Sequence, residues 1–139
     1  MIDNMNMRAK RTEHWDTVAK VLGLKNKSFF GGVERCGFSV EQLSGFLDLG
    51  FIALEYKCNN TPTVEVFHEF GKRAEALGAS IEYIGFLESE YRKDAKLIIE
   101  GIKVTNFHDS ANLIMDFSQT FHEADEFTTE PELLRAWYD

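Results

Sequence analysis

Two runs of alternating residues in the middle of the chain, 81–88 and 96–104, constrain the fold more than any other feature. Both are rich in Ile, Val, Tyr and Phe and repeat with a period of two, which is typical of β-strands. The short polar segment between them, with residues 91–93 at its tip, predicts an antiparallel hairpin. An isolated hairpin is marginal in water, so a third strand is expected beside it.

The register of the hairpin follows from joining the apolar residues of both runs on one face. The expected pairs are Leu87 with Leu97, Phe86 with Ile98, Gly85 with Ile99, Tyr83 with Gly101 and Glu88 with Lys96. Side chains alternate between the faces of a strand, so one face is apolar throughout and should lie on the core. Its members are Ile81, Tyr83, Gly85, Leu87, Leu97, Ile99 and Gly101.

The opposite face of the hairpin mixes apolar and charged residues. It carries Glu82, Ile84, Phe86, Glu88, Lys96, Ile98, Glu100, Ile102 and Val104. One interpretation is that a helix or a chain terminus covers its middle while the glutamates lie at the rim. The other is that the apolar residues form an exposed patch for a partner, since sizeable patches on proteins usually mark interaction sites.

Helices are predicted over residues 12–22, 40–49, 62–77 and 110–121, where apolar residues recur at helical spacing. Ser39 and Gln42 form a capping box before the second helix. Thr61 is expected to cap the third, with Pro62 in its first position. An alternating strand is the other interpretation of residues 110–121, and the helix is preferred.

The remaining segments complete an α+β prediction. Residues 25–38 are expected to be irregular, and 132–138 favour a third strand over a helix because the hairpin needs a neighbour. The fold is therefore expected to have N-terminal helices packed on a small antiparallel sheet centred on the hairpin, followed by a helix and a C-terminal strand. The chain of 139 residues has the length of a single domain, 1–139, in which we expect a flexible segment 1–10.

The charge of the chain is acidic and unevenly distributed. The formal net charge of −8 disfavours nucleic acids and anionic membranes as partners, because binding to phosphates depends on Lys and Arg. Residues 1–27 contain six basic residues and three acids, whereas residues 108–139 contain eight acids and Arg135 alone. This asymmetry indicates either an acidic surface for a basic partner or a solvated face.

The two cysteines and the N-terminus bear on location. Cys36 and Cys58 have neither the number nor the spacing of a disulfide framework or a zinc site. Residues 1–7 show no apolar signal core, and no stretch approaches the length of a membrane span. The sequence therefore predicts a cytoplasmic protein with reduced thiols and no membrane partner.

Three segments carry a resemblance to other proteins. They are residues 60–63 (Asn-Thr-Pro-Thr) before a helix, residues 124–127 (Ala-Asp-Glu-Phe) and the closing residues 133–139. Together they resemble a group of small uncharacterised bacterial proteins with an Ala-Asp-Glu-Phe segment and a tryptophan-rich final strand, although this chain has Tyr138 where a second tryptophan is expected. The resemblance covers the C-terminal two thirds of the chain. It implies a compact bacterial α+β domain and carries no activity.

No motif for a metal, a nucleotide or a nucleophile is complete. Glu65 and His68 share a helical face, as in carboxylate-bridged metal sites, but a second matching motif is absent from the sequence. Cys36 follows Arg35, which could lower the pKa of its thiol, yet no base is indicated. The sequence predicts no metal, no cofactor and no catalytic residue.

Two functional hypotheses remain. The first is a non-catalytic interaction or regulatory protein that binds or neutralises a basic partner, or forms a homodimer, through the mixed face. Its apolar anchors would be Ile84, Phe86, Ile98 and Ile102, with Glu82, Glu88 and Glu100 at the rim. The alternative is a small hydrolase or metal-dependent enzyme that uses the carboxylates of Glu82, Glu88 and Glu100.

Overall fold

Four helices and five strands form the part of the chain that the structure describes. The structure is a computed structural model, and it describes residues 5–23, 33–58, 60–88 and 97–138. The elements are α1 (Met5–Val21), β1 (Val33–Phe38), α2 (Val40–Asp48), α3 (Val64–Ala76), β2 (Ser80–Glu88), β3 (Leu97–Thr105), α4 (Ala111–Thr120), β4 (Glu126–Glu130) and β5 (Leu133–Trp137). The predicted α+β class is confirmed.

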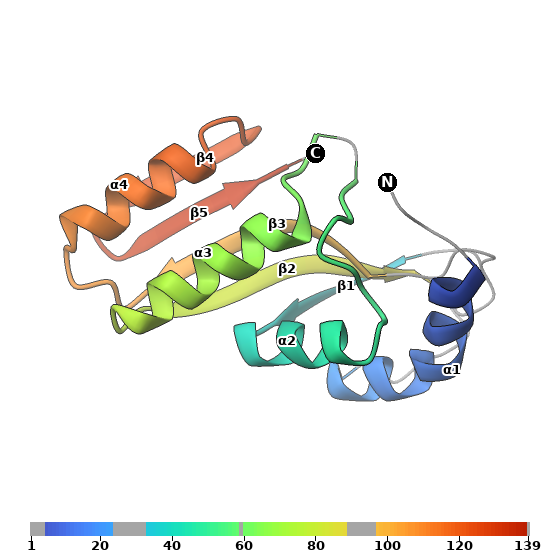
Figure 1. The fold of residues 1–139 in the computed structure, drawn as a ribbon. Coiled ribbons are helices and arrows are strands. Elements are labelled where there is room, and N and C mark those ends of the chain that lie inside the picture. Colours follow the sequence, from blue (N-terminus) through green and yellow to red (C-terminus); the bar gives the residue numbers. More distant parts are fainter. Residues whose placement is uncertain (1–4, 24–32, 59, 89–96, 139) are drawn as a thin grey trace.

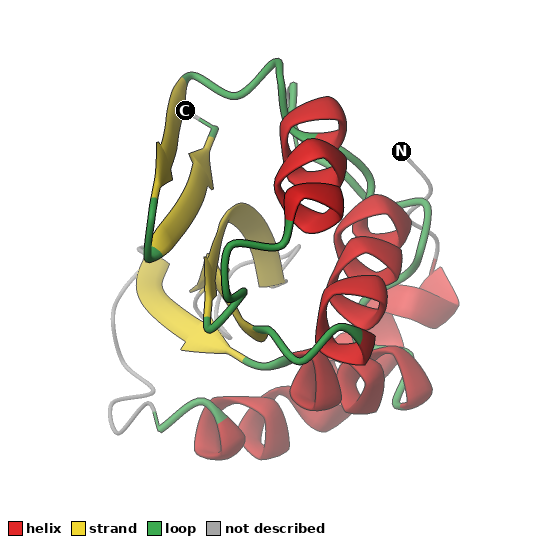
Figure 2. Cartoon of the chain, turned by 90° about the vertical axis from the view of Figure 1, so that its left-hand side faces the viewer, coloured by secondary structure: helices red, strands yellow, loops and turns green. Residues whose placement is uncertain are grey.

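The strands form one antiparallel sheet in the order β1-β2-β3-β5-β4. The described helices lie on the same side of this sheet, with α1 at one end and α4 at the other (Figure 1). A view turned by 90° shows the same arrangement, with strands on one side and helices on the other (Figure 2). The core lies between the two layers, and none of the described helices covers the opposite face of the sheet.

The predicted hairpin is present as β2 and β3, and half of its register is as predicted. Leu87, Phe86 and Gly85 pair with Leu97, Ile98 and Ile99, respectively. The register then shifts, so that Ile84 pairs with Gly101 and Tyr83 with Ile102. Residues 91–93 and Lys96 lie outside the described residues.

The register shift is a β-bulge at Glu100, and it reverses the faces of the rest of β3. The predicted pair of Tyr83 with Gly101 is therefore wrong. Ile102 and Val104, which were assigned to the mixed face, are both fully buried in the core. One extra residue on a strand with period two turns every later side chain to the opposite face.

Two strands were missed in the sequence. The interval 25–38, predicted to be irregular, ends in β1, which pairs with β2 along its whole length. Residues 29–32 (Phe-Phe-Gly-Gly), whose glycines predict a turn, lie outside the described residues. The short β4 pairs with the predicted C-terminal strand β5. Both missed strands lie at the edges of the sheet, where half-exposed residues give only a weak apolar pattern.

Local caps fix the start of each helix that follows a strand or loop. Ser39 caps α2, and both hydrogen bonds of the predicted capping box with Gln42 are present. The cap of α3 is Thr63 and not Thr61, because Thr61 is buried and its hydroxyl accepts a hydrogen bond from the Cys58 N–H. Ser110 caps α4, so the helical interpretation of this segment is confirmed.

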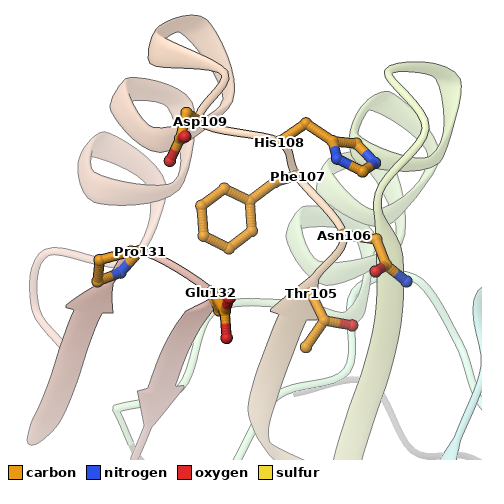
Figure 3. Close-up of a pocket in the computed structure, with 7 residues that line it drawn as sticks. All are labelled: Thr105, Asn106, Phe107, His108, Asp109, Pro131 and Glu132. Atoms are coloured by element: carbon orange, nitrogen blue, oxygen red, sulfur yellow. The ribbon is translucent and has the colours of Figure 1, made fainter.

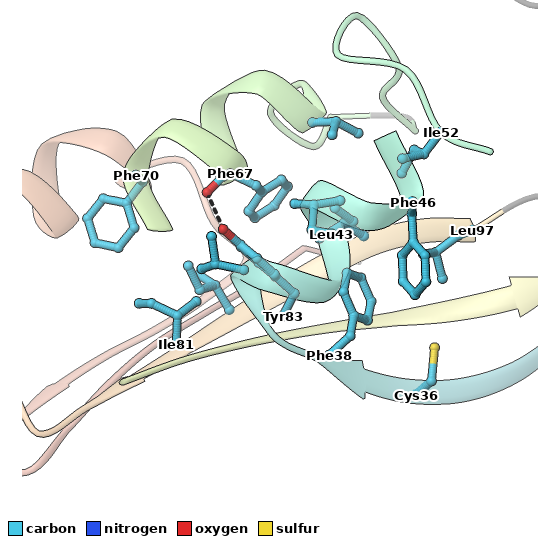
Figure 4. Close-up of a cluster of buried hydrophobic side chains, with 14 of the residues drawn as sticks. Cys36, Phe38, Leu43, Phe46, Ile52, Phe67, Phe70, Ile81, Tyr83 and Leu97 are labelled. Carbon is cyan, nitrogen blue, oxygen red and sulfur yellow. Dashed lines mark hydrogen bonds between the residues drawn. The ribbon is translucent and has the colours of Figure 1, made fainter. Parts of the chain in front are cut away.

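Aromatic side chains join the helical layer to the sheet (Figure 4). Tyr83 of β2 is fully buried, and its hydroxyl donates a hydrogen bond to the carbonyl oxygen of Phe67 on α3 at 2.7 Å. Burial raises the pKa of this phenol. The ring of Phe70 contacts Phe117 of α4 and Phe121 just after it. A single cluster therefore connects α3, α4 and strand β2.

Polar contacts on the outside of α3 differ from those predicted. The i, i+4 spacing of Glu69 and Arg73 predicts an ion pair within α3, but the guanidinium of Arg73 donates two hydrogen bonds to Asp116 of α4, at 2.9 and 3.0 Å. These bonds lower the pKa of the Asp116 carboxyl. Glu69 instead pairs with Lys72. The helical spacing of Phe70, Ala74 and Leu77 predicts that Leu77 is buried, but it is 56% exposed because α3 ends before it.

Candidate functional site

The predicted binding residues are not all on one surface. Ile84, Phe86 and Ile98 lie partly exposed on the face of the sheet that no described helix covers, and Glu82 is exposed there. Ile102 is fully buried on the core side because of the bulge. Neither of the last two predicted residues, Glu88 and Glu100, is fully exposed on this surface. Glu88 is 3% exposed at the end of β2, where its carbonyl accepts a hydrogen bond from Trp15, and Glu100 is partly buried at the bulge.

A hollow of about 330 Å³ occupies the middle of this face. We call it the sheet hollow. Residues from four strands line it: Arg35, Cys36 and Gly37 of β1, Glu82 and Ile84 of β2, Lys103 of β3, and Arg135 and Trp137 of β5. The thiol of Cys36 is not available to it as a nucleophile, because this side chain is buried and its Sγ lies 3.7 Å from the carbonyl oxygen of Gly85.

Two glycines create the space for the side chains around the hollow. A Cβ atom on Gly37 would lie 2.6 Å from Oε2 of Glu82. A Cβ atom on Gly101 would lie 2.7 Å from Cε3 of Trp137. The indole of Trp137 therefore lies over the backbone of Gly101, its partner on the neighbouring strand. A glycine in a strand commonly marks such a close approach.

Arg35 is held between two aromatic rings on this face. Its guanidinium carbon lies 4.9 Å from the ring centroid of Phe86 and 4.6 Å from that of Trp137. Arg135 approaches the same indole, at 5.5 Å. Both arginines lie within the range of cation–π attraction. The contacts fix the orientation of the Arg35 guanidinium and connect β1 to β5 across the sheet.

Three charged residues follow one another in a row across the hollow. Glu82 pairs with Lys103 in the register of β2 and β3, and Lys103 pairs with Arg135 in that of β3 and β5. Two cations therefore stand directly opposite each other on neighbouring strands, an arrangement that destabilises a sheet. Arg135 also has the carboxylate of Glu126 at 3.6 Å.

A larger hollow, of about 530 Å³, lies at the end of the sheet (Figure 3). Its lining comes from the last residue of β3, the segment after it and the turn between β4 and β5: Thr105, Asn106, Phe107, His108, Asp109, Pro131 and Glu132. Phe107 fills the middle and is buried, whereas His108, Asp109 and Glu132 are exposed. Asn106, His108 and Asp109 have positive φ angles. Within the described residues no group of three His, Cys, Asp or Glu side chains could hold a metal ion, here or elsewhere.

The Glu65 and His68 pair has a different role from the one its spacing indicates. Nε2 of His68 lies 2.8 Å from Oγ of Ser44, so the imidazole joins α3 to α2. Glu65 is exposed, and the two residues form no metal group. Burial, and secondarily the charge of Lys72, lowers the pKa of His68 below its ordinary value of 6.5.

The stability of the protein is expected to fall as the pH drops through the folded-state pKa of His68. The folded state disfavours the protonated imidazole, so below pH 6.5 the unfolded chain binds more protons at this residue. Its contribution to the free energy of unfolding is therefore complete above pH 6.5 and is lost in more acidic solution. Chemical denaturation between about pH 8 and about pH 5 measures this. His68→Gln should flatten the pH dependence, and a variant whose pH dependence equals that of the wild type contradicts the prediction.

The sequence did not indicate Arg35, Lys103, Arg135 and Trp137 as site residues. Arg35 lies in a strand that was missed, and Lys103 reaches the outer face only because of the bulge. The one available signal was the alternation in the C-terminal strand, which places Arg135 and Trp137 on the same face.

Comparisons with protein families, curated proteins and solved structures found no match to this chain. None of the described helices combines the length and the apolar content that crossing a bilayer requires.

Proposed function

We propose that this protein is a non-catalytic interaction protein that binds a partner through the sheet face around the sheet hollow. The supporting observation is the cluster of Arg35, Phe86 and Trp137 on a face that no described helix covers. Arginine and aromatic residues are enriched at the centres of interfaces, where they contribute most of the binding energy. Partly exposed Ile84 and Ile98 extend the cluster into a surface of mixed character.

The rival hypothesis, a carboxylate-based enzyme, requires acids that converge on one point. Glu82 and Glu88 are six positions apart on β2, which is roughly 20 Å at the rise of a strand. Glu88 is buried, whereas Glu82 is exposed. The geometry of the described residues thus supports binding better than acid–base catalysis.

The overall charge bears on the partner. A protein with a net charge of −8 attracts basic proteins over a distance set by the salt concentration. The exposed acids Glu126 and Glu130 lie in the edge strand β4, and exposed Glu132 lies in the turn after it. We therefore propose a basic protein as the partner, attracted by these acids. A second copy of the chain is the other partner to be tested.

Capture from a lysate of the source cells, at low and at high salt, tests the proposal. We expect the wild-type protein to retain a partner that a Phe86→Ser, Arg35→Ala variant loses. Leu77→Ser is the matched control, because Leu77 is exposed on the helical side of the molecule. This control should retain the same partner. Light scattering on the purified proteins tests the homodimer in parallel.

Two outcomes would contradict the proposal. The first is that the wild-type protein is a monomer and that no captured protein is reduced in yield with the Phe86→Ser, Arg35→Ala variant. The second is a partner that both variants lose equally, because its binding then depends on general stability and not on the sheet face. Circular dichroism of each variant identifies a loss that results from unfolding.

A further inference from the structure

We propose that the sheet hollow is a binding site for a carboxylate side chain of an acidic and apolar peptide segment. This inference rests on the proposed function and assigns the chemistry of the group that enters the centre of the interface. It differs from the steering of a basic partner, which depends on the acids at the edge of the sheet.

The first observation is the local reversal of charge. The chain contains 23 acidic and 15 basic residues, yet the hollow is lined by three cations and one acid. The cations are Arg35, Lys103 and Arg135, which come from three different strands. Because acids outnumber bases in the chain as a whole, three cations around one hollow are a local reversal of charge.

The second observation is the placement of Lys103 directly opposite Arg135. Like charges at opposed positions repel, and such a pair is relieved when an anion lies between them. The carboxylate of Glu126 is 3.6 Å from Arg135, and it comes from the edge strand beyond β5. A carboxylate from outside, placed above the row, would contact the cations that line the hollow.

The third observation concerns the rings and the aliphatic side chains beside the cations. Arg35 is oriented by Phe86 and Trp137, so its planar guanidinium is prepared for a carboxylate before a ligand arrives. Partly exposed Ile84 and Ile98 lie on the same face. A small free acid would leave these apolar side chains uncovered, whereas a peptide with alternating acidic and apolar residues would cover both surfaces.

The same observations disfavour a nucleic acid in the hollow. A phosphate backbone presents one charge after another and needs a continuous basic track. Here Glu82 and Glu126 lie beside the three cations, and the net charge of the chain is −8. The site suits a single carboxylate.

A nuclear magnetic resonance titration of the full chain tests the inference. The probe is the capped peptide acetyl-Leu-Glu-Leu-Glu-Leu-amide, and the control is the same peptide with Gln in place of Glu. We expect the acidic probe to shift the Trp137 indole signal and the Arg35 and Arg135 side-chain signals. The Gln peptide should bind roughly tenfold more weakly or worse, because its contacts to the arginines lose the charge. Inorganic phosphate is the third probe and should bind more weakly than the acidic peptide.

Substitutions in the hollow supply a second, independent readout. Lys103→Gln and Arg135→Gln should each weaken the acidic probe severalfold. The control is Arg73→Gln, which lies on α3 and pairs with Asp116 outside the hollow. It should leave the affinity unchanged.

Each alternative result overturns the inference. Equal binding of the Gln and Glu peptides, absence of binding, or insensitivity to both hollow substitutions excludes a carboxylate site. Phosphate that binds as tightly as the peptide shows a simple anion site. If a partner is captured through the sheet face while the acidic probe does not bind, this inference fails and the proposed function stands. If no partner depends on the face, the proposed function itself fails.

Discussion

Replacing Phe70 with alanine is expected to lower the free energy of unfolding by about 3–5 kcal/mol. Phe70 is fully buried on α3. Its ring lies 5.9 Å from that of Phe117 and 5.1 Å from that of Phe121, centroid to centroid, in edge-to-face arrangements. The substitution removes apolar area from the core and leaves a cavity between α3 and α4. On the outside, the two hydrogen bonds from Arg73 to Asp116 still join these helices.

Urea denaturation of the purified variant measures this loss. Two substitutions provide the scale. Ser39→Ala removes the cap of α2 and should cost about 0.5–2 kcal/mol. Leu77→Ala changes an exposed side chain next to α3 and should stay within about 0.5 kcal/mol of the wild type. A loss for Phe70→Ala smaller than that for Ser39→Ala would mean that α3 does not contribute to the core as described.

The features of the fold that are encoded locally could be predicted from the sequence. The capping box of Ser39 and Gln42, the cap at Ser110 and the alternation of the hairpin each depend on residues close together in the chain. The C-terminal strand was predicted from a tertiary requirement, since a hairpin alone is marginal. Edge strand β1 was missed because its sequence, with glycine and charged residues, lacks the apolar alternation of the central strands.

The candidate site could be predicted only in part, because it depends on the bulge. Before Glu100 the register was predicted correctly, and Phe86 and Ile98 lie on the outer face as expected. After it, the faces of Ile102 and Lys103 are exchanged, so an apolar anchor moved into the core and a cation moved into the hollow. The carbonyl of Glu100 accepts a hydrogen bond from the Tyr138 N–H at 2.8 Å. That partner is distant in sequence, so no local pattern indicates the bulge.

Gly85 is the residue on β2 that permits this bulge, and its replacement by alanine is expected to destabilise the protein by about 3 kcal/mol. A Cβ atom there would lie 2.0 Å from the carbonyl oxygen of Ile98 and 3.3 Å from Cα of Ile99. Both atoms belong to the backbone of β3 at residues that pair with β2, so β3 cannot move away here without disturbing that pairing. The cost should therefore reach the upper end of the range for an overpacked interior.

The matched control is Gly45→Ala in α2, where an added Cβ atom meets nothing within 4 Å. It should stabilise the protein by about 0.5–1 kcal/mol, because alanine is a better helix former than glycine. Urea denaturation compares the two variants, and amide signals of Ile102 and Lys103 show whether the faces of β3 are retained. If Gly85→Ala is as stable as the wild type, β3 can give way at this point. The bulge, and with it the position of Lys103 in the sheet hollow, would then not depend on the close approach at Gly85.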